Sequence, residues 1–183
     1  MPVLYSDRLM LRELEQEDYL LFSSVFSNES VMRYAYIDQI TDEQEMRDYF
    51  TQILHNRASA MRNAYDFAVF CARENHFVGF ADLELYYCNQ ALLYGELGYF
   101  LLPEHWGKGY ACEITKRLIN FGFEDLGLNR LIARCNANNQ RSEKVMQKSG
   151  MIKEATFAQA RLKFGQWNDE HQYRLLREEW NRK

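Results

Sequence analysis

Two glycines with one residue between them lie in a stretch that could bind a phosphate. The stretch reads Trp106-Gly107-Lys108-Gly109-Tyr110-Ala111 and joins an apolar run to an amphipathic one. At the start of a helix, several backbone N–H groups are exposed and the helix dipole adds partial positive charge. Glycine lets the backbone approach a phosphate that a Cβ atom would keep away. The stretch predicts a pyrophosphate site, although an ordinary strand-to-helix turn looks the same. It matches neither the P-loop nor the three-glycine dinucleotide fingerprint.

A carboxylate stands inside the apolar run that precedes the glycines. Glu96 lies between Gly95 and Gly98 in the segment Leu92–Leu102. A carboxylate in poor solvent holds a proton more tightly, which suits a base that takes a proton from an amine. The alternative is an exposed glutamate on the other face of a sheet. Asp82 and Glu84, in the apolar run before this one, are the reserve choices for the base.

A third group of polar residues follows further along the chain. It reads Asn136-Ala137-Asn138-Asn139-Gln140-Arg141-Ser142 and continues as Val145-Met146-Gln147-Lys148-Ser149-Gly150-Met151. Asparagine is a frequent helix N-cap, and a glycine often ends a helix at the C′ position. This pattern predicts a helix that begins at Asn139 and ends at Gly150.

Taken in order and spacing, these segments resemble the GNAT superfamily of acetyl-CoA-dependent N-acetyltransferases, and within it the RimJ/RimL-like branch. The resemblance covers nearly the whole chain. The matching stretches are Arg8-Leu9-x-Leu11-Arg12 for the opening strand, Gly95–Leu101 for the fourth strand, Trp106–Ala111 for the pyrophosphate loop, Asn139-x-x-Ser142 with Lys148-x-Gly150 for the last cofactor helix, and Gly165-x-Trp167-x-Asp169 for the closing hairpin.

The resemblance implies where acetyl-CoA binds. The pyrophosphate would meet the backbone N–H groups of Gly107, Lys108, Gly109, Tyr110 and Ala111. The backbone near Leu101 and Leu102, where a bulge splays the fourth and fifth strands apart, would pair with the pantetheine and the thioester carbonyl and hold the oxyanion. Asn139 would hydrogen-bond the pantetheine arm, cap the helix, or do both.

The chain departs from the superfamily at two positions. Trp106 stands where the loop usually begins with Gln or Arg, which matters little because the cradle is mainly backbone. Met146 stands where many members carry a tyrosine that protonates the leaving thiolate, and methionine has no proton to give. Ser142 is then the expected acid and Glu96 the expected base. The resemblance implies direct transfer in a ternary complex, in preference to an acetylated Cys112.

Composition limits the other possibilities. The chain has 183 residues and a net charge of -4, without the basic stripe that nucleic-acid binding needs. The four cysteines show no CxxC pair, so we expect free thiols in a reducing cytosol and no metal site. The start of the chain has no signal-peptide pattern, and no run reaches the roughly 18 apolar residues of a membrane span. We expect a cytoplasmic protein.

Apolar periodicity predicts a mixed α/β fold with a mostly antiparallel sheet, in one domain over residues 1–183. The resemblance implies that this central sheet is splayed and flanked by helices. Strands are expected at Arg8–Arg12, Phe67–Cys71, Phe77–Tyr87, Leu92–Leu102, Leu131–Cys135 and, with a turn at Gly165, Met151–Leu176. A break is expected at Cys88-Asn89-Gln90. Helices are expected at Asp18–Phe26, after a Thr41–Gln44 capping box, from the glycine loop to Leu126, and at Asn139–Gly150.

The predicted function is acetyl transfer from acetyl-CoA to a primary amine. A protein N-terminus, a polyamine, an amino acid and an aminoglycoside-like drug all stay open as acceptors. A homodimer also stays open. The alternative from another class is a non-catalytic acyl-CoA-binding sensor that has the same fold.

Overall fold

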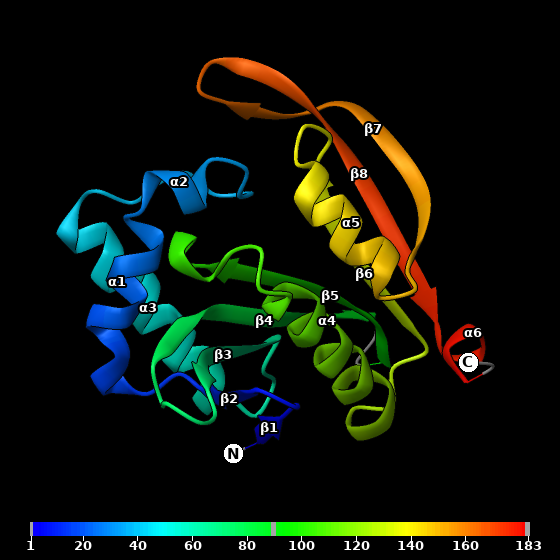
Figure 1. Ribbon diagram of the computed structural model, residues 1–183, viewed down its shortest axis with the longest axis horizontal. Helices are drawn as coiled ribbons and strands as arrows, with labels where there is room; N and C mark the ends of the chain where they lie inside the picture. Colours follow the sequence, from blue (N-terminus) through cyan, green and yellow to red (C-terminus); the bar gives the residue numbers. More distant parts are fainter. Residues whose placement is uncertain (1, 89–90, 182–183) are drawn as a thin grey trace.

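The computed structural model describes residues 2–88 and 91–181. Within them the strands form one sheet in the order β1-β2-β3-β4-β5-β6-β8-β7 (Figure 1). Neighbouring strands are antiparallel except for β5 and β6, which are parallel. The strands are β1 Val3–Tyr5, β2 Leu9–Glu13, β3 Ala64–Cys71, β4 Phe77–Cys88, β5 Ala91–Leu101, β6 Arg130–Asn136, β7 Ile152–Lys163 and β8 Gln166–Leu176.

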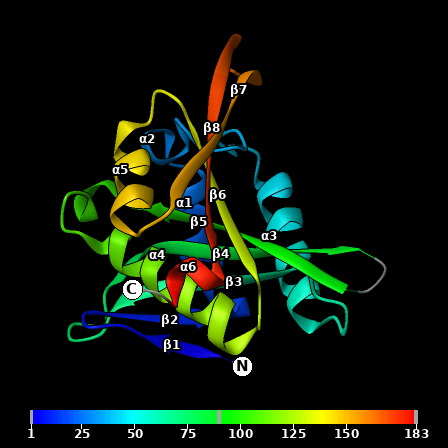
Figure 2. The ribbon, with the colours of Figure 1, turned by 90° about the vertical axis from the view of Figure 1, so that its right-hand side faces the viewer.

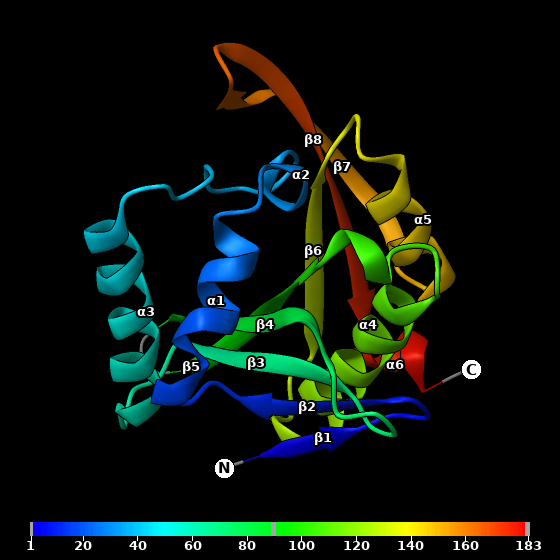
Figure 3. The same cartoon turned by 60° about the vertical axis from the view of Figure 1, so that its left-hand side comes forward.

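Helices cover both faces of this sheet. Helices α1 and α3 lie on one side, and α4 and α5 lie on the other (Figure 3). The helices are α1 Tyr19–Phe26, α2 Glu29–Met32, α3 Glu43–Ala58, α4 Tyr110–Asn120, α5 Gln140–Lys148 and α6 Arg177–Trp180. Short helical turns are η1 Gln16–Asp18, η2 Pro103–His105 and the π-helical η3 Phe121–Asp125 that extends α4. The expected mixed α/β fold is confirmed.

The alternation of side chains along β5 divides the core in two. Leu97 and Leu101 pack in the cluster that includes Ile114 and Leu118 of α4. Phe100 packs against the cluster that contains α1 and α3. Because successive residues of a strand face opposite sides, β5 presents one set of side chains to each layer. Residues next to each other in the sequence therefore serve different faces of the molecule.

Most expected elements are confirmed, with two corrections. The capping box expected at Thr41 is one residue too early: Asp42 is the N-cap of α3, and its carboxylate accepts from the Glu45 N–H at 2.9 Å. Gln44 instead donates to Asp48 one turn along the helix. The short strand β1 was not expected. The break predicted at Cys88-Asn89-Gln90 falls partly on positions 89 and 90, which lie outside the described residues.

The hairpin of β7 and β8 extends well beyond the rest of the sheet (Figure 2). Its turn is at Phe164 and Gly165, both with positive φ, as expected at Gly165. The Lys163 ammonium donates to the backbone carbonyl of Ile37 and lies 2.9 Å from the Asp38 carboxylate. The end of the hairpin is thus tied to the segment between α2 and α3. In the described part of the chain, every helix is too short or too polar to cross a membrane.

Candidate active site

An opening lies between β5 and β6. Their parallel pairing covers Gly95 with Leu131 and Glu96 with Ile132, and within the described residues it goes no further (Figure 1). Strand β5 continues for five more residues, to Leu101, while it stays paired with β4. The expected splay of these two strands is present.

Backbone groups of β5 point into this opening. The Leu102 N–H donates to the Val78 carbonyl of β4, which fixes the alternation of the ladder. Since alternate residues of an antiparallel strand bond to the same neighbour, the N–H and C=O groups of Leu97, Tyr99 and Leu101 point away from β4. They line the space where β6 has turned away.

The structure changes the expectation for Leu101 and Leu102. Both backbone groups of Leu102 are engaged, because its carbonyl also accepts from the His105 N–H at 2.9 Å. The Leu101 carbonyl accepts from the indole Nε1 of Trp106 at 2.7 Å. Leu102 is therefore a poor partner for pantetheine or an oxyanion. The Leu101 N–H and the backbone of Tyr99 are the groups directed into the opening.

The glycine loop has the backbone that a phosphate cradle requires. Gly107 and Gly109 have φ of 75° and 85°, the left-handed region that side chains rarely adopt. Gly109 is the N-cap of α4 and has no side chain to satisfy the first N–H groups of the helix. Arg8 supports the loop, since its guanidinium donates to the Lys108 carbonyl at 3.0 Å and pairs with Glu113 at 2.7 Å. The loop fits a pyrophosphate.

The α4–α5 side of the opening has a pair of hydroxyl groups. The Tyr99 hydroxyl donates to Ser142 Oγ at 3.1 Å. Asn139 caps α5 by accepting from the Ser142 N–H at 3.1 Å, so its capping role is confirmed. Met146, one turn beyond Ser142, is buried.

Burial raises the pKa of Tyr99 to about 12, so the phenol keeps its proton at neutral pH. Sequence reasoning missed Tyr99, although strand alternation places it on the face opposite Glu96.

The α1–α3 side of the opening holds a cavity of about 360 Å³. Strands β3, β4 and β5 supply its floor, and α1 and α3 supply its wall. Carboxylates from two strands line it: Asp66 of β3, and Asp82 and Glu84 of β4. Tyr36 and Tyr49 also line it, with their hydroxyls 3.5 Å apart. Of the described residues that line the cavity, none is Lys or Arg. The acidic pocket, as we call this cavity, has the charge to hold a cation.

The three carboxylates are close neighbours. Asp66 is directly opposite Asp82 across the β3–β4 ladder, and Glu84 is two residues further along β4. Burial raises the pKa of Asp82 well above its ordinary value, and nearby Asp66 and Glu84 raise it further. Burial likewise raises the pKa of Asp66 to about 7. An acid that resists ionisation in the empty pocket is stabilised in its ionised form by an incoming ammonium.

A family model described as an acetyltransferase (GNAT) domain matches residues 8–152. The chain belongs to the GNAT acetyltransferases. It is 32% identical over 174 residues to the uncharacterized N-acetyltransferase YnaD of Bacillus subtilis (strain 168), covering 95% of this chain and 96% of YnaD. The activity class predicted from the sequence, an N-acetyltransferase, is that of this family.

Two solved structures share the fold of this acetyltransferase. Spermidine N-acetyltransferase from Vibrio cholerae, in complex with CoA and spermine, superposes with a TM-score of 0.83 at 20% identity, covering 95% of this chain and 98% of that one. RimL, the ribosomal L7/L12 α-N-protein acetyltransferase, in complex with coenzyme A, superposes with a TM-score of 0.81 at 18% identity, covering 97% and 99%. At these identities, both likenesses concern the fold.

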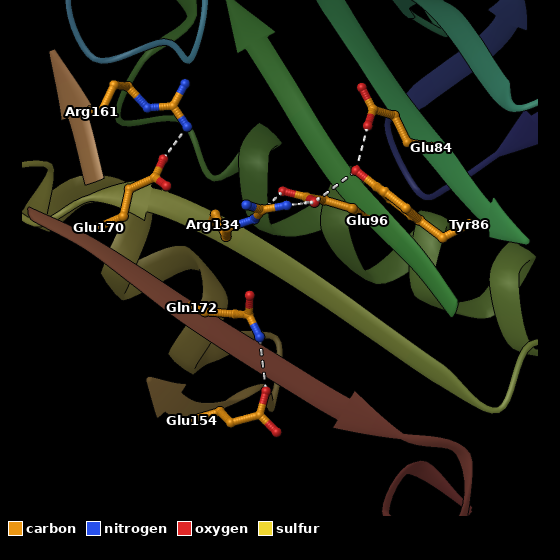
Figure 4. Close-up of polar contacts among 8 residues, drawn as sticks. All are labelled: Glu84, Tyr86, Glu96, Arg134, Glu154, Arg161, Glu170 and Gln172. Carbon is orange, nitrogen blue, oxygen red and sulfur yellow. Dashed lines mark hydrogen bonds and ion pairs between the residues drawn. The ribbon is translucent and has the colours of Figure 1, made fainter. Parts of the chain in front are cut away.

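Glu96 of the acetyltransferase is held by its neighbours. Arg134 of β6 binds both of its carboxylate oxygens, at 3.0 and 2.6 Å (Figure 4). The Tyr86 hydroxyl donates to Glu84 at 2.9 Å and lies 3.3 Å from the Glu96 carboxylate. Glu96 faces the same side of the sheet as the acidic pocket, but its oxygens are committed to donors. Its role as the base stays a prediction.

Asp66→Asn is expected to stabilise the acetyltransferase at neutral pH and to have little effect in acid. An unfolded aspartate titrates near pH 4, whereas the pKa of Asp66 in the fold is about 7. As pH rises between these values, the unfolded state ionises first, so the free energy of unfolding falls. Asparagine removes this loss, which for a pKa raised by about 3 is on the order of a few kcal/mol. Thermal unfolding should show a melting-temperature gain that grows from about pH 4 to about pH 7 and then levels. A gain independent of pH would contradict it.

Three metal-binding residue types meet at the turn between β3 and β4. Cys71, Glu74 and His76 place their ligand atoms within 4.8 Å of one another. The cluster was not expected from the cysteine spacing, because its ligands are of three different types. The three residues lie outside the lining of the acidic pocket and outside the glycine loop.

Proposed function

We propose that this acetyltransferase moves the acetyl group of acetyl-CoA onto a primary amine of a small acceptor that carries more than one positive charge, such as a polyamine. The observation that carries the proposal is the acidic pocket, which collects three carboxylates in about 360 Å³ beside the opening. A neutral acceptor would leave these acids without a countercharge, and a multiply charged amine supplies one. The spermine bound to the structurally similar V. cholerae enzyme is in keeping with this choice.

The cofactor side of the proposal rests on the glycine loop and on α5. The N–H groups of Gly107, Lys108, Gly109, Tyr110 and Ala111 would hold the pyrophosphate at the start of α4. The backbone of Tyr99 and the Leu101 N–H would pair with the pantetheine and stabilise the oxyanion. The side-chain amide of Asn139 still has its N–H groups for the pantetheine, because only its oxygen serves the cap.

Ser142 is the proposed proton donor to the leaving thiolate. Because Tyr99 donates to Ser142 Oγ, the serine hydroxyl is left with its own proton to offer elsewhere. The phenol that many relatives carry at the position of Met146 is thus replaced, in this proposal, by a hydroxyl pair from β5 and α5.

A comparison of matched amines tests the function. 1,4-Diaminobutane should release thiol from acetyl-CoA with a kcat/KM at least about 10-fold above that of 1-aminobutane, which has the same carbon chain and lacks the distal amino group. Peptides, amino acids and aminoglycosides complete the panel, and thiol release is followed with a chromogenic disulfide. Equal rates for the two butylamines would contradict the cationic acceptor. Tight acetyl-CoA binding without thiol release with any amine would favour the acyl-CoA sensor.

A further inference from the structure

A second carboxylate beside the splayed part of β5, besides that of Glu96, belongs to Asp82. Asp82 pairs with Gly98 of β5, two residues beyond the last contact between β5 and β6. Its carboxylate lies across this glycine, since a Cβ on Gly98 would be 2.6 Å from Oδ1. A side chain at position 98 would push the carboxylate away, so the glycine lets an acid rest against the splayed part of β5.

The Asp82 carboxylate is also uncommitted. Within residues 2–88 and 91–181 it receives no hydrogen bond and forms no ion pair, although it lines the acidic pocket. Its neighbours differ. Glu96 is bound by Arg134, and Glu84 accepts from Tyr86. Asp66 lies one strand further from β5. Asp82 is the acid that has both the position and the free oxygens to meet an amine.

The two faces of β5 place opposite chemistry on either side of the opening. Asp82 contacts Gly98 on the α1–α3 side. Tyr99, the next residue, turns to the other side and binds Ser142. An amine in the acidic pocket and a thioester threaded from the α4–α5 side would therefore meet at the same stretch of β5, with a proton acceptor behind the amine and a proton donor behind the sulfur.

Resting on the proposed function, we infer that Asp82 is the residue that takes the proton from the acceptor amine. The ionised Asp82 carboxylate accepts one proton from the ammonium, and the freed nitrogen lone pair forms the C–N bond with the acetyl carbon. As the C–S bond breaks, the coenzyme A sulfur takes a proton from Ser142, and the nitrogen gives up its second proton to water, which reprotonates Ser142. Ammonium and thioester thus become amide, thiol and the one proton held by Asp82. The protonated Asp82 returns its proton to solvent through the pocket. Glu96, held by Arg134, is then a positioning residue that keeps β5 and β6 joined at the point where they separate.

The surroundings of Asp82 suit this role. Burial and the neighbouring acids raise its pKa, which brings its affinity for a proton closer to that of an alkylamine, whose pKa is about 10. Proton transfer between groups of similar pKa meets little thermodynamic resistance. An aspartate free in water, with a pKa of about 4, would take the proton far less readily.

Asp82→Asn tests the assignment through its pH–rate profile. At saturating acetyl-CoA and diamine, kcat at neutral pH should fall about 10²–10³-fold while KM changes less than 10-fold. The decrease in kcat relative to the wild type should become smaller at high pH, where solvent deprotonates the amine. Acetyl-CoA affinity, measured by calorimetry, should stay within about 3-fold and shows that the variant is folded, because the cofactor binds on the other face.

Two matched variants and a second readout complete the test. Glu84→Gln removes the same charge from the same pocket and should raise KM while keeping the wild-type pH profile. Glu96→Gln should lower kcat less than Asp82→Asn does and also keep that profile. Without acetyl-CoA, diamine binding should release protons from the wild type and fewer from Asp82→Asn, as calorimetry in buffers of different ionisation enthalpy reports.

The outcomes separate the inference from the proposed function. If Asp82→Asn keeps the wild-type pH–rate profile and releases as many protons as the wild type, Asp82 is not the proton acceptor. If Glu96→Gln, and not Asp82→Asn, changes the pH–rate profile, Glu96 is the proton acceptor instead. A wild-type enzyme that releases no thiol with any amine contradicts the proposed function. In that case the proton-release measurement alone decides whether Asp82 is the acid that meets a bound ammonium.

Discussion

Gly109→Val weakens acetyl-CoA binding by at least about 10²-fold, because the loop must leave the conformation that directs its N–H groups outward. Gly109 has a φ of 85°, where a β-branched residue is a steric outlier that costs more than the roughly 1–2 kcal/mol of other residues. A hydrogen bond to a charged group contributes about 1.5–3 kcal/mol. Losing two such bonds from the loop to the pyrophosphate corresponds to about 10²–10⁴ in affinity. Isothermal titration calorimetry measures the dissociation constant directly.

Gly127→Val is the matched control for this prediction. Gly127 also has a positive φ, 70°, and no atom lies within 4 Å of a Cβ built there, so the backbone penalty is similar. It lies after η3, outside the glycine loop. The control should lose stability while keeping acetyl-CoA affinity. If Gly109→Val binds acetyl-CoA as tightly as the control does, the loop is only a turn.

Ser142→Ala is expected to lower turnover about 10–10³-fold and to change the acetyl-CoA dissociation constant only a few-fold. A hydroxyl that bonds to sulfur as charge develops acts mainly in the transition state, so its removal affects kcat more than binding. Tyr99→Phe should give a smaller loss, because it removes the partner of Ser142 and leaves the serine proton in place. Met146→Tyr in the Ser142→Ala background tests whether a phenol one turn along α5 restores part of the rate.

Rapid quench of the first turnover provides the control for this prediction, because it shows whether chemistry limits kcat. Wild-type rates in Ser142→Ala, with chemistry limiting, would mean that the thiolate leaves without help. An equal loss in Tyr99→Phe and Ser142→Ala would mean that the two hydroxyls act as one unit.

Local patterns in the sequence predicted the elements well, because each pattern depends on neighbours a few residues away. The alternation in β5, the apolar face of α3 and the glycines at 107 and 109 all follow from backbone geometry and burial. The N-cap of α3 was misplaced by one residue, since Thr41 and Asp42 are both good caps and their backbone conformation decides between them.

The site was harder to predict because its contacts join distant parts of the chain. No local signal indicates that Arg134 binds Glu96 or that Trp106 occupies the Leu101 carbonyl. The free carboxylate of Asp82 became apparent only when β4 was placed beside Gly98. Resemblance to a family located the cofactor loop, whose function depends on backbone, but it could not show which acid is left without a partner.

The residues that line the acidic pocket lie in one part of the sequence, which matters for how the selectivity for the acceptor amine can be changed. Every described residue that lines the acidic pocket falls between Leu14 and Phe100, whereas the glycine loop, α4 and α5 follow after it. Under the proposed function, the acceptor pocket and most of the acyl-donor residues are thus encoded in consecutive stretches of the gene, with Arg8 and Tyr99 as the exceptions. A library confined to the pocket-lining codons between Leu14 and Tyr87 would vary the accepted amine while Arg8, Tyr99 and the glycine loop are inherited intact. The same division gives a natural lineage a route to new acceptors without a new way to bind acetyl-CoA.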